Sequence, residues 1–92
     1  MATLHIVNHP SAIADCLEVA GQNDTILLIE EGVRAATQAH GRDLVALSED
    51  LASREINVLA AGVETTDYPG FVDLVATHQP IVSWNRSGSK TD

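Results

Sequence analysis

Cys16 is the only cysteine of the chain and its one candidate nucleophile. A reactive thiol needs a lowered pKa, which usually comes from a helix N-terminus or from nearby cations. Cys16 instead falls about a turn and a half into a predicted helix, on its apolar face. Its sequence neighbours Asp15 and Glu18 are anionic and disfavour the thiolate. The residues alone therefore favour a small buried hydrophobic side chain at this position.

The four histidines are the next candidates for chemistry. His5 lies within the first predicted strand, and His9 follows that strand directly. Ligands commonly bind at the carboxyl ends of strands in an open parallel sheet, so His9 is the better functional candidate, with a solvated turn residue as the alternative. His40 and His78 are expected near helix C-termini, where the helix dipole favours them.

Glu30 and Glu31 follow the second predicted strand, and we expect them at the same rim as His9. They could form a paired-carboxylate site, although solvated rim charge is the favoured interpretation. No Cys/His pair has the spacing of zinc ligands, and glycine-rich nucleotide-binding loops are absent from the sequence. We therefore expect neither a metal nor a cofactor.

Apolar strands alternate with helical patterns along the whole chain. Strands are predicted at residues 3–7, 25–29, 43–47, 63–66 and 81–84. Helices are predicted at residues 11–20 (with Ser11 as N-cap), 33–39 (with Gly41 as its stop), 48–54 and 69–78. Residues 55–62 fit either a short strand or a buried loop. This alternation predicts an α/β fold with a mostly parallel sheet of about five strands flanked by helices.

Length and composition indicate one small domain that gains stability from partners. Residues 1–84 are expected to form it, and 85–92 to be a flexible polar tail. The 92-residue chain is 45% apolar but only 3% aromatic, so its own core is marginal and burial against other subunits is expected. Trp84, the only tryptophan, would be an interface anchor or would cover the core.

Charge and hydropathy exclude several classes of partner. The net charge is −8 and the five basic residues are scattered, which argues against direct nucleic-acid binding. No apolar run approaches the length of a membrane helix, and no signal peptide is seen. A lone thiol fits a reducing cytoplasmic location.

Five segments, in order along nearly the whole chain, resemble motifs of the TusB/DsrH family of sulfur-relay subunits. Leu4–Pro10 resembles the family's LHTVN-x-SP start, Leu27–Val33 with Ala35 and Ala36 its LLL-x-(D/E)GV-x-AA segment, and Leu44–Leu51 its VYAL-x-EDL segment. Asp67-Tyr68 with Phe71, Val72 and Leu74 resembles its DY-x-x-FV-x-L motif, and His78 with Trp84 its closing H-x5-W.

The resemblance implies a DsrE-like fold and a cytoplasmic hexamer. That hexamer would hold two copies each of this subunit, a DsrE/TusD-like subunit and a DsrF/TusC-like subunit. Such assemblies pass persulfide sulfur between cysteines and sulfur-carrier proteins, toward 2-thiouridine in tRNA or within dissimilatory sulfur oxidation. Cys16 matches the cysteine in the first helix of DsrH-type members, which implies a persulfide carrier. TusB-type members lack that cysteine, which leaves open a noncatalytic scaffold that positions a partner's cysteine. From the residues alone, a stand-alone small-molecule binding domain using the rim near His9 and Glu31 also stays open.

Overall fold

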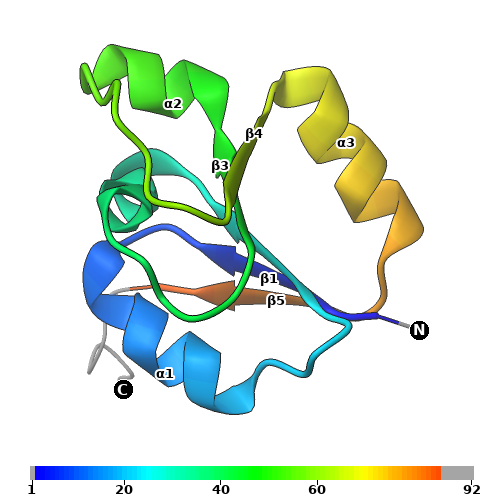
Figure 1. Ribbon diagram of the computed structural model, residues 1–92. Helices are drawn as coiled ribbons and strands as arrows, with labels where there is room; N and C mark the ends of the chain where they lie inside the picture. The colour runs from blue at the N-terminus through cyan, green and yellow to red at the C-terminus, as the bar shows by residue number, and fades with distance from the viewer. Residues whose placement is uncertain (1, 86–92) are drawn as a thin grey trace.

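The computed structural model describes residues 2–85, and the predicted polar tail from residue 86 onward lies outside them. Its five strands form one sheet in the order β4-β3-β2-β1-β5 (Figure 1). Their bounds are β1 Leu4–Val7, β2 Thr25–Leu28, β3 Leu44–Leu47, β4 Val63–Thr66 and β5 Ile81–Trp84. Every neighbouring pair is parallel, which confirms the predicted α/β fold.

Helices cover both faces of the sheet. Their bounds are η1 Pro10–Ala12, α1 Ile13–Val19, η2 Glu30–Thr37, α2 Ser48–Ser53 and α3 Tyr68–Thr77, where η marks a 3-10 helix. The helix α1 lies on one side of the sheet and α3 on the other (Figure 1). None of the helices in residues 2–85 has the length and apolar character needed to cross a bilayer.

The main core lies on the face that α1 and η2 cover. Parallel register places Val7 beside Leu28, and Leu28 beside Ala46, on this face. Cys16 from α1 and Val33 from η2 pack against them. Trp84 also packs against this cluster, so covering the core, one of its two predicted roles, is what the structure shows. No residue of α3 belongs to the cluster.

The first helical segment begins differently from the prediction. Ser11 is the predicted N-cap, but His9 occupies that position, and its ring accepts a hydrogen bond from the Ser11 backbone N–H. Pro10 then opens a 3-10 turn that leads into α1. The predicted N-cap is therefore wrong, because an imidazole nitrogen can accept the same bond as a serine hydroxyl.

The second helix also departs from its predicted form. It is a 3-10 helix that begins at Glu30 and ends at Thr37, so Gly41 lies beyond its end and is not its stop. Gly32 explains the early start, since a Cβ atom on it would overlap the backbone carbonyl of Val7. Only glycine lets this helix approach the end of β1 so closely.

The segment for which the sequence fits two structures, residues 55–62, is a loop. Ile56 and Leu59 pack against the main core. The backbone N–H of Ala60 donates to the carbonyl of Ala36 at 2.9 Å, which ties the loop to η2. The loop therefore buries apolar side chains without adding a strand.

Candidate functional site

Cys16, the candidate nucleophile, is fully buried in the main core. Its exposed fraction is 0%, and it lies on the buried face of α1 together with Ile13. An approaching electrophile or persulfide would have to displace core side chains to reach the sulfur. This conformation matches the predicted small buried side chain.

Burial also raises the pKa of the Cys16 thiol to about 11. The Arg42 guanidinium acts in the opposite direction, and the Asp24 carboxylate raises the pKa further. The sequence predicts an anionic contribution from Asp15 and Glu18, but it comes from Asp24, which is more distant along the chain. A thiol with this pKa is protonated at neutral pH, and the protonated form is a poor nucleophile.

Close to this core, His5, Asp24 and Trp84 form a chain of hydrogen bonds. His5 is 3% exposed. Its Nε2 lies 2.9 Å from a carboxylate oxygen of Asp24, and its Nδ1 lies 3.0 Å from the indole nitrogen of Trp84. Because an indole N–H can only donate, Nδ1 must accept, and the ring proton of a neutral His5 lies on Nε2, where it donates to Asp24.

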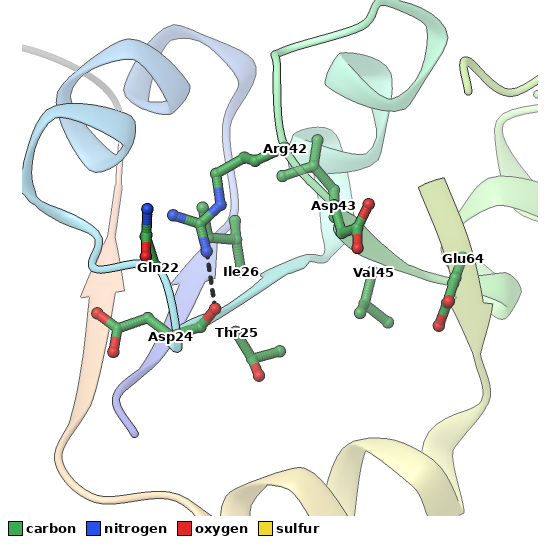
Figure 2. Close-up of a pocket in the computed structure, with 9 residues that line it drawn as sticks. Gln22, Asp24, Thr25, Ile26, Arg42, Asp43, Val45 and Glu64 are labelled. Atoms are coloured by element: carbon green, nitrogen blue, oxygen red, sulfur yellow. Dashed lines mark hydrogen bonds between the residues drawn. The ribbon is translucent and has the colours of Figure 1, made fainter. Parts of the chain in front are cut away.

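Asp24 organises the turn that precedes β2. Its carboxylate accepts hydrogen bonds from the backbone N–H groups of Thr3 and Gly21, at 3.0 and 2.9 Å. The pKa of Asp24 is lowered to about 2. The hydrogen bond from His5 is the largest cause, and these two backbone hydrogen bonds are the next largest. Arg42 closes the same turn, since its guanidinium donates to the carbonyl of Gly21. It also donates to the carbonyl of Asp24 (Figure 2).

A pocket of about 500 Å³ opens beside this turn. Its polar lining is Gln22, Asp24, Thr25, Arg42, Asp43 and Glu64 (Figure 2). Ile26, Leu44 and Val45 supply its apolar lining. These residues belong to the amino-terminal ends of β2, β3 and β4 and the loops before them. The pocket is thus at the opposite edge of the sheet from the rim where the sequence predicts ligands.

The predicted rim site is occupied by contacts within the chain. The His9 ring lies 3.0 Å from the Ser11 hydroxyl besides capping η1. The Glu31 carboxylate accepts hydrogen bonds from Arg34 and Arg54, and these bonds lower its pKa. Glu30 has a positive φ of 52°. The Glu31 carboxylate is therefore engaged with two arginines, which favours charged rim residues over a paired-carboxylate site.

His40 and His78 act at helix ends, as predicted. His40 Nε2 lies 2.9 Å from the carbonyl of Ala35 near the end of η2. His78 Nδ1 donates to the carbonyl of Leu74, and its Nε2 lies 2.8 Å from the hydroxyl of Thr25. His78 thereby attaches the end of α3 to the sheet.

Asp24 and Arg42 are not among the predicted site residues, although the charges of both act on the Cys16 thiol. The available signal is weak: Asp24 belongs to a helix-breaking turn, and Arg42 precedes a strand. Within residues 2–85 no cluster of three or more His, Cys, Asp or Glu side chains is arranged to hold a metal ion.

Comparison with known proteins identifies the family. The model of the DsrH-like protein family matches residues 8–81 of the chain. No curated protein matches it. The match runs from the residue after β1 to the first residue of β5 and therefore includes Cys16, Asp24, Arg42 and all of α3. The chain belongs to the DsrH-like family, as its sequence motifs predict.

Proposed function

We propose that this chain is a subunit of a cytoplasmic sulfur-relay complex and that it positions the active cysteine of a partner subunit instead of carrying persulfide itself. Membership of the DsrH-like family supports the sulfur-relay assignment. The proposed assembly is a heterohexamer with DsrE/TusD-like and DsrF/TusC-like subunits. Residues 1–84 would form its single DsrH/TusB-like domain.

The observation that carries the scaffold role is the state of Cys16. A sulfur carrier must present a thiolate to a persulfide donor and then expose the new persulfide to an acceptor. The Cys16 sulfur has no exposed surface, and its pKa is raised to about 11. Burial of the sulfur and the raised pKa of the thiol therefore oppose both the uptake of sulfur from a donor and its delivery to an acceptor.

A second candidate, persulfide transfer through Cys16, has one observation in its favour. The Arg42 cation acts to lower the thiol pKa. Movement of α1 in the complex could then expose a thiolate beside that cation. Burial of Cys16 outweighs this effect in the structure, so the carrier role is the runner-up.

Two other functions receive no support from the contacts of the arginines and the rim residues: direct nucleic-acid binding and a stand-alone binding domain. Arg34, Arg42 and Arg54 all bind groups within the chain, which supports the absence of direct nucleic-acid binding. A stand-alone binding domain at the rim finds no support, because the side chains of His9 and Glu31 are engaged in capping and ion pairing. Sulfur-carrier proteins would then contact the assembly chiefly through the partner that bears the active cysteine.

Relay assays on the reconstituted complex test the proposal. The chain is co-purified with its DsrE-like and DsrF-like subunits, and a persulfidated donor protein is added. The Cys16→Ala complex should relay sulfur at the wild-type rate, and Cys16 of the wild type should gain no sulfur, which would add about 32 Da. A sulfur adduct on Cys16, together with loss of relay in Cys16→Ala, would establish the carrier role instead.

A further inference from the structure

The helix α3 carries an apolar stripe that the described residues 2–85 leave exposed. Tyr68, Val72 and Val75 lie at i, i+4 and i+7 and therefore share one face of the helix. They are 51%, 65% and 39% exposed. Phe71 and Leu74, at the other apolar positions, are only partly buried, and no residue of α3 is fully buried. An apolar helix in this state usually marks an interaction site.

Next to α3, the carboxylates of Asp43 and Glu64 line the pocket. Asp43 and Glu64 lie on the same side of the pocket, which has Ile26 and Val45 in its apolar lining (Figure 2). In the part of the chain that the structure describes, neither carboxylate forms an ion pair. Thr25 connects the pocket to α3, since its hydroxyl lies 2.8 Å from His78. Arg42 also lines the pocket, but its guanidinium donates to the backbone carbonyls of Gly21 and Asp24. Apolar walls with the carboxylates of Asp43 and Glu64 therefore fit a Lys or Arg side chain, which has an apolar stem and a cationic end.

Charge decides which occupant fits this surface. No Lys or Arg occurs between Arg54 and Arg86, whereas Glu64, Asp67 and Asp73 all fall in this stretch. In a two-fold contact between copies the same patch would face itself, so acidic groups would meet acidic groups. A second copy of this chain is therefore a poor occupant. A partner with basic residues beside an apolar patch is complementary.

We propose that the α3 surface, defined by Tyr68, Val72 and Val75 with Asp43 and Glu64, docks a neighbouring subunit of the relay complex. The neighbour presents an apolar patch against the stripe, and a Lys or Arg side chain enters the pocket. This inference rests on the proposed function, because it takes the DsrE-like and DsrF-like subunits as partners.

Substitution of one valine in the stripe gives the sharpest test. Val72→Asp places a charge in the stripe, and Val19→Asp is the matched control, since Val72 and Val19 are 65% and 63% exposed. In co-purification with the two related subunits, Val72→Asp should lower their recovery about tenfold, as loss of a central interface contact does. Val19→Asp should leave recovery unchanged. Circular dichroism of each isolated variant confirms that it is folded.

A second pair of variants tests the charge component. Asp43→Asn with Glu64→Gln should weaken the complex and flatten its dependence on salt, because fewer charges are paired across the interface. Glu18→Gln with Glu55→Gln removes the same charge outside the α3 surface and should change neither property.

Three results would contradict the inference in different ways. A complex that forms normally with Val72→Asp overturns the docking surface while leaving the proposed function intact. If the isolated wild-type chain sediments as a dimer and Val72→Asp abolishes that dimer, the occupant of the α3 surface is a second copy of this chain and not a partner subunit. Absence of any complex with the wild-type chain contradicts the proposed function, and the inference falls with it.

Discussion

The indole nitrogen of Trp84 donates a hydrogen bond of 3.0 Å to Nδ1 of His5, although the two residues are 79 positions apart. Their strands, β5 and β1, are neighbours in the sheet, and Trp84 pairs in register with Val7. The rings of His5 and Trp84 are tilted by 34° with centroids 6.1 Å apart. The bond fixes the end of an edge strand to a buried side chain of the sheet interior.

Trp84→Phe should lower the free energy of unfolding by about 1–3 kcal/mol, because it leaves the Nδ1 acceptor of buried His5 without a donor. Urea denaturation of the isolated chain measures this. Tyr68→Phe, which removes a polar group from an exposed aromatic residue, should change stability by less than about 0.5 kcal/mol. Equal stability of Trp84→Phe and wild type would mean that the hydrogen bond does not stabilise the fold.

Asp24 should make stability depend on pH in the acid range. Its folded pKa is about 2, below the ordinary value of 3.8, so the folded state is favoured while the carboxylate is ionised. This contribution is complete above the ordinary pKa and is lost as the pH falls toward about 2. Urea denaturation at a series of pH values should show a steeper loss for wild type than for Asp24→Asn.

The exposed Asp73 provides the control for this pH series. Asp73→Asn should reproduce the wild-type slope, since its side chain projects from α3 into solvent. If Asp24→Asn also kept that slope, the hydrogen bonds from His5 and the two backbone N–H groups would not be responsible for acid sensitivity.

Strand positions can be predicted from the sequence because most strands are short, largely apolar runs between turn residues. Every predicted strand agrees with the structure to within one residue at each end. Boundaries of the helical segments are less predictable. The start of η2 depends on contact between Gly32 and the Val7 carbonyl, a tertiary relation that helical periodicity does not contain.

The polar network near Cys16 cannot be predicted for a similar reason. Asp24 is hydrogen-bonded to His5, which is 19 positions away in the sequence, and Arg42 donates to the Asp24 carbonyl from 18 positions away. The sequence favours His9 over His5 because strand ends at the rim are common ligand sites. Burial of Cys16, in contrast, follows from its place on the apolar face of a helix.

Gly32→Ala should destabilise the chain by about 1–3 kcal/mol, the range for an overpacked buried site. The added methyl would overlap the backbone carbonyl of Val7, which cannot move without disturbing β1. Thermal unfolding followed by circular dichroism measures the effect. Gly21→Ala is the control, since its Cβ would meet only Asp24 side-chain atoms, at 3.5 Å or more. Similar melting temperatures for both variants would contradict the close approach of η2 to β1.

Alkylation of Cys16 should be slow in the folded chain. Its pKa is raised from the ordinary value of 9.0 to about 11, so at a pH of about 8 the thiolate fraction should be about a hundredfold lower than in the unfolded chain. Burial slows the reaction further, because iodoacetamide must wait for local opening of α1. The measurement is the rate of iodoacetamide labelling by mass spectrometry, with and without denaturing urea. Addition of the related subunits separates the two roles of Cys16. A scaffold keeps the slow rate in the complex, whereas a carrier whose thiolate is exposed by its partners reacts there at least as fast as the unfolded chain.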